Sequence, residues 1–89
     1  MIVEFDRSFS KSLSKIKDNP SLKKIEKLIL EVEKSKKLSS ISNLKKLTGY
    51  KTYYRIRMGN YRVGIESISS KTIRFILVAH RKDIYRKFP

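Results

Sequence analysis

The sequence predicts an α+β domain in which a small, twisted, mainly antiparallel sheet packs against a helical hairpin near the N-terminus, in the order β-α-α-β-β-β. Three observations indicate this fold. Residues 53–65 alternate between mostly apolar side chains and side chains that include the arginines. They do so on both sides of Gly59-Asn60, a pair that suits a tight hairpin turn. The run Ile73–Ala79 is almost entirely apolar, as in a central strand covered on both faces. Apolar residues between positions 22 and 32 recur at helical spacing, so that a helix can cover the sheet.

The first residues are expected to supply one strand and the first helix of the hairpin. Ile2–Phe5 has the character of a short strand. Asp6 or Ser8 can cap the helix that follows, because both side chains can accept a hydrogen bond from a free backbone N–H. The apolar face of this helix is expected to consist of Phe9, Leu13 and Ile16.

The second helix is expected to start after the break at Asp18-Asn19-Pro20. Asn19 is predicted to be its N-cap and Pro20 its first-turn residue. Its apolar stripe is formed by Leu22, Ile25, Leu28, Ile29 and Val32. Serine and lysine dominate residues 35–42, which predicts a loop. A helical turn is expected next, because apolar residues recur every third position, at Ile41, Leu44 and Leu47.

The hairpin strands are expected to divide their side chains between a core face and a charged face. By the period-2 rule, Tyr54, Ile56 and Met58 share one face. The other face carries Tyr53 and the arginines, which are Arg55, Arg57 and, after the turn, Arg62. The third strand ends in His80-Arg81, with Tyr85 shortly after it. Arginines on one sheet face, met by these residues at a strand end, predict a concave site for a polyanion.

Charge is the strongest global feature of the chain. Lys and Arg number 22 against 8 Asp and Glu, which gives a formal net charge of +14 at pH 7. No acidic residue occurs between Glu33 and Glu66, and this stretch includes Lys45, Lys46, Lys51 and the three hairpin arginines. Lysine overuse in an AT-rich genome can explain the lysines, but not arginines that alternate within apolar strands. The charge therefore indicates a polyanionic partner, either nucleic acid or an acidic protein.

Composition also argues against several classes of protein. A chain of 89 residues predicts one domain, residues 1–89. There is no cysteine, and no run of about 18 apolar residues predicts a membrane span, so the reducing cytoplasm is the expected compartment. The chain has no carboxylate pair, Ser-His-Asp set or cluster of ligands at metal-site spacing. We therefore expect neither a metal nor a cofactor.

Three segments carry motifs of a known family: Leu44–Gly49, Tyr54–Val63 and Val78–Arg86. Within them, Gly-x-Tyr-Arg begins at Gly59 and His-Arg-x-x-x-Tyr begins at His80. Together with the predicted order of elements, these segments resemble the RelE/ParE superfamily of toxins from type II toxin–antitoxin modules. RelE-type members are ribosome-dependent endoribonucleases that cut messenger RNA in the ribosomal A site. ParE-type members poison DNA gyrase.

The resemblance implies a role for each matching residue. The family's two basic positions on the first hairpin strand fall on Arg55 and Arg57, and its arginine after the turn falls on Arg62. Its arginine at the end of the third strand falls on Arg81, and its C-terminal tyrosine on Tyr85. The archetypal RelE differs, because it has lysines at the first pair, a longer spacing to the tyrosine and a C-terminal helix. Since a guanidinium does not give up its proton, Arg55 and Arg57 are expected to bind phosphate and not to abstract protons.

The implied chemistry is metal-independent RNA cleavage, in which a ribose 2′-OH attacks the adjacent phosphorus and leaves a 2′,3′-cyclic phosphate. Arg57, Arg62 and Arg81 are expected to offset the charge that develops on the phosphoryl oxygens. His80 is a candidate base because histidine titrates near neutral pH, and Tyr85 is either a second candidate or a platform for a nucleobase. The predicted catalytic residues are Arg62, Arg81, Tyr85 and His80. The predicted RNA-binding residues are Arg55, Arg57, Lys51 and Lys46.

The implied function is that of a type II toxin, an mRNA interferase that inhibits translation. Its implied partners are messenger RNA, the ribosome and an acidic antitoxin with which it forms a hetero-oligomer, with no role for a membrane. Two alternatives stay open. One is a ParE-like inhibitor of DNA gyrase, and the other is a non-catalytic relative that only binds RNA.

Overall fold

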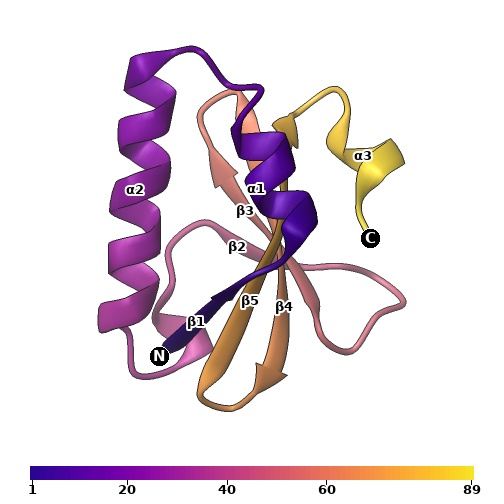
Figure 1. The fold of residues 1–89 in the computed structure, drawn as a ribbon. Helices are drawn as coiled ribbons and strands as arrows, with labels where there is room; N and C mark the ends of the chain where they lie inside the picture. The colour runs from indigo at the N-terminus through magenta and orange to yellow at the C-terminus, as the bar shows by residue number, and fades with distance from the viewer.

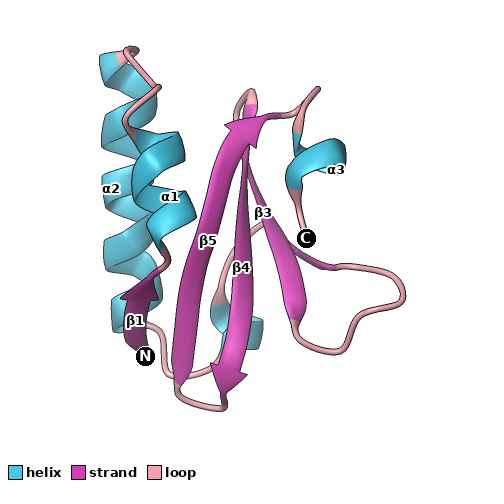
Figure 2. Ribbon diagram, turned by 45° about the vertical axis from the view of Figure 1, so that its right-hand side comes forward, coloured by secondary structure: helices cyan, strands magenta, loops and turns pink.

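The computed structural model describes residues 1–89 and consists of a five-stranded sheet with helices on both faces (Figure 1). The elements in chain order are β1 (Ile2–Phe5), α1 (Arg7–Leu13), α2 (Asn19–Lys34), the 3-10 helix η1 (Leu38–Ser40), β2 (Leu44–Lys46), β3 (Tyr53–Met58), β4 (Tyr61–Ser69), β5 (Thr72–His80) and α3 (Ile84–Lys87). The strand order is β1-β5-β4-β3-β2, and only the β1–β5 pair is parallel. Helices α1 and α2 cover one face, and α3 lies against the other (Figure 2). The predicted α+β fold is confirmed.

The main hydrophobic core lies between the helical hairpin and the sheet. Helix α2 buries Ile25, Leu28 and Val32 of its predicted stripe. Helix α1 contributes Phe9, whose ring meets that of Phe75 on β5 edge-on, with the centroids 5.3 Å apart. Complete burial of one such side chain contributes about 1.5–3 kcal/mol, so this layer holds the helices on the sheet.

Both helices of the hairpin differ from expectation at one end. Helix α1 stops before Ile16, although the Ile16 side chain is still buried in the core. The sequence predicts Asn19 as the N-cap of α2, but the N-cap in the structure is Asp18. The Asp18 carbonyl accepts the N–H of Leu22 at 3.1 Å, and its carboxylate accepts the hydroxyl of Ser21. The Asp18 carbonyl thus closes the first turn of the helix, whereas its carboxylate accepts no backbone N–H.

The helical turn predicted through Leu44 and Leu47 is wrong. Residues Leu44–Lys46 form the edge strand β2, antiparallel to β3, with Lys45 opposite Arg55. Leu44 packs on the main core, whereas Leu47 belongs to a second cluster on the other face of the sheet. Side chains three residues apart lie on opposite faces of a strand, and β3 offers hydrogen-bond partners that a local turn does not.

The β3–β4 hairpin turns at Gly59-Asn60, as predicted. Gly59 has a φ of +59°, and Asn43 is the only non-glycine residue with a positive φ. A positive φ at the first central residue alone is the arrangement of a type II′ turn, which glycine adopts without steric cost.

The second hydrophobic cluster lies under the C-terminal segment, on the sheet face opposite α1 and α2. Its buried members are Leu47, Ala79, Ile84 and Phe88. The segment after Arg81 forms only the single turn α3. None of the helices has the length and the apolar character needed to cross a bilayer.

Candidate nucleic-acid interface

Three arginines of the β3–β4 hairpin lie on the sheet face opposite α1 and α2. Arg57 on β3 is directly opposite Arg62 on β4, and Arg55 is opposite Lys45 on β2. These four cations line one open cavity of about 350 Å³, and its other lining residues are Asn43, Leu44 and Tyr85. The predicted division of the hairpin into a core face and an arginine face is confirmed. We call this space the arginine cavity.

The arginine cavity has no carboxylate to balance its charge. No acidic side chain lines it, and the two ion pairs of the molecule, Arg74–Glu4 and Arg86–Asp83, lie elsewhere. Like charges directly opposite one another across two strands are destabilising. A bound phosphate would relieve this repulsion and accept charge-assisted hydrogen bonds from the guanidinium groups. The cavity is therefore suited to a polyanion.

Arg62 is held in place by the hairpin turn. Its guanidinium Nη1 donates to the carbonyl oxygens of Gly59 at 2.9 Å and Tyr61 at 3.0 Å. A guanidinium carries five N–H donors, so donors remain for a ligand. The two backbone contacts orient Arg62 before any ligand binds, which favours stabilisation of charge that develops during a reaction.

Tyr85 reaches the arginine cavity from α3. The Arg55 Cζ atom lies 4.5 Å from the centroid of the Tyr85 ring, which is a cation–π distance. The Tyr85 residue is 73% exposed, so a large part of the ring stays accessible to a ligand. The short spacing between Arg81 and Tyr85 is thus sufficient to bring the tyrosine to the arginines.

His80 lies on the opposite, helix-covered face of the sheet. It lines a separate cavity of about 440 Å³, together with residues of α1 that include Ser8 and Lys11. Its ring meets that of Tyr61 edge-on, with the centroids 5.9 Å apart, and its Nδ1 accepts the backbone N–H of Lys82 at 3.2 Å. The structure therefore separates His80 from the arginines.

Arg81 does not line the arginine cavity but lies in the turn after β5, close to the hairpin turn. Its backbone N–H donates to the carbonyl oxygen of Asn60 at 2.8 Å. Arg81 forms no ion pair with the neighbouring Asp83, which binds Arg86 with an N–O distance of 2.6 Å. The exposed side chain of Arg81 is left without a carboxylate partner.

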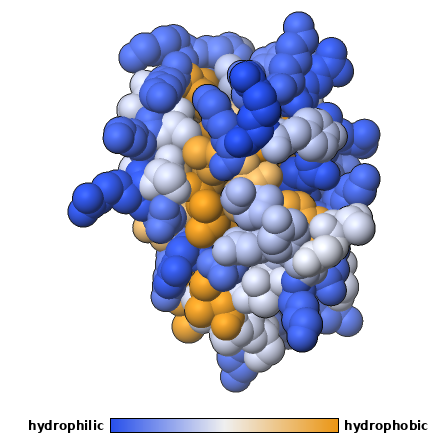
Figure 3. Space-filling model, turned by 90° about the vertical axis from the view of Figure 1, so that its right-hand side faces the viewer, coloured by the Kyte–Doolittle hydropathy of each residue, from blue (hydrophilic) through white to orange (hydrophobic).

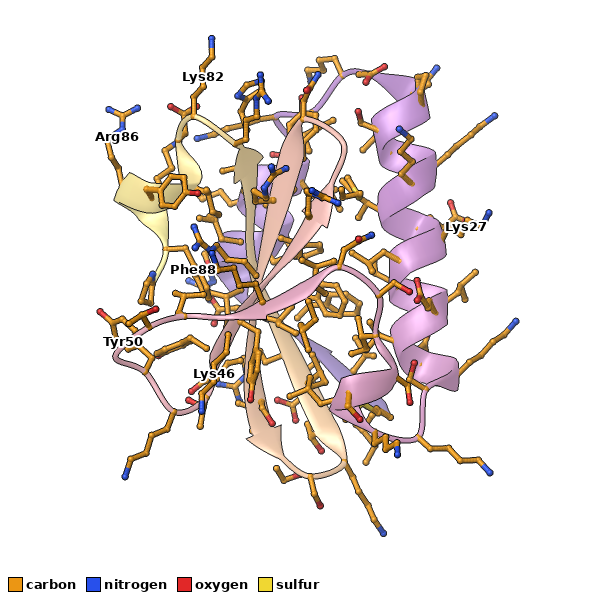
Figure 4. The ribbon with its side chains drawn as sticks, turned by 180° about the vertical axis from the view of Figure 1, so that it is seen from behind. Lys27, Lys46, Tyr50, Lys82, Arg86 and Phe88 are labelled. Carbon is orange, nitrogen blue, oxygen red and sulfur yellow. The ribbon has the colours of Figure 1, made fainter.

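The two predicted RNA-binding lysines also lie outside the arginine cavity. Lys46 is opposite Tyr54 in the β2–β3 ladder, so the pleat directs it away from the face of Arg55. Lys51 is exposed in the loop between β2 and β3. Figure 4 shows Lys46 separated from Lys82 and Arg86 by the C-terminal segment that carries Phe88.

Lys45 and Asn43 line the arginine cavity although neither was predicted to belong to a site. A helical interpretation of this segment gives Lys45 no neighbour on β3, whereas its strand pairing sets it opposite Arg55. Asn43 has a φ of +61°, and its carbonyl accepts the N–H of Arg57 at 3.1 Å. The sequence signal for this part of the site is the basic pair Lys45-Lys46 after Leu44. Only the assignment of a strand places the two lysines on opposite faces of the sheet.

The surface on the α3 side is largely polar. Figure 3 shows this side as mostly hydrophilic side chains around a narrow run of apolar ones. Fold and surface together define a class: a small, strongly basic α+β protein whose sheet carries an open cluster of arginines that is suited to a polyanion.

Comparison with known proteins identifies the family. A family model described as the ParE toxin of the type II toxin–antitoxin system parDE matches residues 3–85. Toxin RelE3 of Methanocaldococcus jannaschii is 43% identical over 90 residues, which span 100% of each chain. The chain therefore belongs to the RelE/ParE superfamily and is a RelE-family toxin of a type II toxin–antitoxin system.

Solved structures agree with this assignment. The crystal structure of a RelB-RelE antitoxin-toxin complex from Methanococcus jannaschii matches with a TM-score of 0.80 and 42% identity, over 97% of this chain and 99% of the other. The isolated E. coli RelE toxin matches with a TM-score of 0.70 and 22% identity, over 97% of this chain and 92% of the other. At that lower identity the likeness concerns the fold alone.

Proposed function

We propose that this toxin is a metal-independent endoribonuclease that cleaves messenger RNA on the ribosome. The observation that carries the proposal is the convergence of Arg55, Arg57 and Arg62 with Tyr85 around one open cavity. Forked cations bind and stabilise phosphoryl charge, and an accessible aromatic ring stacks on bases of single-stranded RNA. The cavity has side by side the two kinds of group that an RNA site requires, which supports the proposal.

In the proposed reaction the 2′-oxygen forms a new bond to phosphorus while the bond from phosphorus to the 5′-oxygen breaks. The products are a 2′,3′-cyclic phosphate and a free 5′-OH. Arg57 and Arg62 bind the phosphoryl oxygens as their negative charge increases. Tyr85, acting in its phenolate form, takes the proton of the 2′-OH and becomes the phenol, and the Lys45 ammonium gives a proton to the departing 5′-oxygen. Arg81, in the turn after β5, adds its positive charge near the phosphate when RNA is bound.

Tyr85 is preferred to His80 as the proton acceptor because of its position. Tyr85 lines the same cavity as the arginines, whereas His80 lines a different one beside α1. No group of three His, Asp or Glu side chains lies close enough together to hold a metal ion. The reaction proposed here needs only the chain's own residues, and cleavage should persist in the presence of a chelator.

The proposed partner in the resting state is an acidic antitoxin, in a hetero-oligomer within the cytoplasm, where message and ribosomes are found. Two features support it: the net charge of +14, and the 42% identical archaeal relative whose structure is a RelB-RelE complex. Copurification from the native operon should yield a complex whose partner suppresses toxicity. A toxin that stays alone and needs no suppressor would contradict this part of the proposal.

A second candidate function is inhibition of DNA gyrase, which the match to the ParE toxin model favours. Primer extension on translated message, with chelator present, and a gyrase supercoiling assay on the same preparation distinguish the two. Cleaved message with unaffected supercoiling supports the ribonuclease. Intact message with inhibited supercoiling would replace it by the gyrase inhibitor, and binding of RNA without either effect would indicate a non-catalytic relative.

A further inference from the structure

The C-terminal segment is fixed to the sheet by one aromatic side chain. Phe88 follows α3 directly and is only 4% exposed. It packs in the second hydrophobic cluster with Leu47 and Ile84. Its ring also meets that of Tyr53 edge-on, with the centroids 5.5 Å apart. Because Tyr53 and Arg55 share one face of β3, this anchor lies on the arginine face of the sheet.

Gly64 leaves the space that this ring occupies. A Cβ atom at position 64 would lie 2.6–2.8 Å from the Cγ, Cδ1 and Cδ2 atoms of Phe88, closer than heavy atoms pack. The φ of Gly64 is not positive, so the requirement for glycine comes from the ring and not from the backbone. In the β3–β4 ladder Gly64 is directly opposite Arg55. Phe88 therefore sits immediately beside the arginine that contacts Tyr85.

The position of Tyr85 depends on this anchor. Tyr85 lies on α3, a helix of four residues, and the N–H of Phe88 donates to the carbonyl of Ile84 at 2.9 Å. A helix this short is not stable by itself, because one turn costs more conformational entropy than its few hydrogen bonds recover. Tertiary contacts at Ile84 and Phe88, one on either side of Tyr85, must supply the rest.

We propose that Phe88, seated on Gly64, is a positioning residue that holds the Tyr85 ring over Arg55. The consequence for RNA cleavage rests on the proposed function, whereas the placement of the ring does not. Displacement of a catalytic group by about 1 Å costs on the order of 100-fold in rate. Since the displaced ring would also lose its stacking on the base while Arg57 and Arg62 still bind the RNA backbone, the main loss should fall on kcat, with a smaller rise in KM.

The test uses Phe88→Leu and Gly64→Ala, with Phe9→Leu in the main core as a matched control of equal chemistry. Each protein is labelled with 3-fluorotyrosine, and the Tyr85 signal in the ¹⁹F NMR spectrum is assigned from its loss in Tyr85→Phe. Cleavage of ribosome-bound message gives kcat and KM. We expect the first two variants to shift the Tyr85 signal and to lower kcat on the order of 100-fold. Phe9→Leu should lower Tm but leave the Tyr85 signal in place.

The double variant Gly64→Ala/Phe88→Leu makes the test specific to this contact. The shorter leucine leaves room for the added methyl group, so the double variant should lose less activity than the two single losses combined. An unchanged Tyr85 signal in Phe88→Leu and Gly64→Ala would overturn the proposal, as would an equal loss of kcat in Phe9→Leu. If the wild type cleaves no RNA, the proposed function fails, and the NMR comparison still decides the placement of Tyr85.

Discussion

The guanidinium carbon of Arg55 lies 4.5 Å from the centroid of the Tyr85 ring and so connects strand β3 to helix α3. A cation–π contact at an exposed site contributes only about 0.5–1 kcal/mol, so its main effect is on geometry. It sets a ring that can stack on a nucleobase beside cations that can bind phosphate. Substitutions at the site can separate these contributions.

Arg57→Ala is expected to lower cleavage without lowering stability. Arg57 is opposite Arg62 in the ladder and forms no ion pair, so its removal relieves repulsion between like charges. The lost charge stabilisation should reduce kcat about 100- to 1000-fold, by analogy with loss of one oxyanion donor. Primer extension gives the rate, and urea unfolding gives the stability. A clear drop in the free energy of unfolding would assign Arg57 a structural role instead.

Lys45→Ala and Lys46→Ala form a matched pair that tests which face of β2 contacts RNA. Lys45 lies with Arg55 in the arginine cavity, whereas Lys46 is opposite Tyr54. Removal of one phosphate contact should reduce the slope of log K against log salt concentration by about 0.7 for single-stranded RNA. We expect this change for Lys45→Ala and a smaller one for Lys46→Ala. The reverse order in a salt titration would place RNA on the other face of the strand.

Tyr85→Phe distinguishes the role of the Tyr85 hydroxyl group in proton transfer from the role of its ring in stacking. The side chain is largely exposed, so the fold should be unaffected, and the phenylalanine ring keeps the stacking surface and the contact with Arg55. We expect RNA affinity to be retained and kcat to fall. The same assay on His80→Gln decides between the two candidate bases. Full activity of Tyr85→Phe with an inactive His80→Gln would return the role to the histidine.

Acid stability should depend on Asp6, the N-cap of α1. The hydroxyl and then the backbone N–H of Ser8 donate to its carboxylate and lower the pKa of Asp6 below its ordinary value of 3.8. The folded state thus favours the charged form, and its stabilisation is present above pH 3.8 and is lost as the pH falls through the folded-state pKa. In thermal unfolding, Asp6→Asn should show a smaller decrease in Tm below pH 3.8 than the wild type. Equal decreases would show that this cap does not contribute.

The sequence by itself determined the elements whose signals are local. Alternation around Gly59-Asn60 defined the hairpin and assigned Arg55, Arg57 and Arg62 to one face. Helical spacing defined the buried stripe of α2. These assignments need only the period of the backbone, because a strand or helix divides its own side chains between faces whatever it packs against.

Only the tertiary structure decided which faces meet. Leu44–Lys46 became a strand because β3 was available to pair with it, and that pairing brought Lys45 to the site. Tyr85 joined the arginines because Phe88 fits over Gly64, while His80 stayed on the far side of the sheet. Ladder register and side-chain packing join residues far apart in the chain, and the free energy of such a contact depends on both partners. A local pattern contains only one of them.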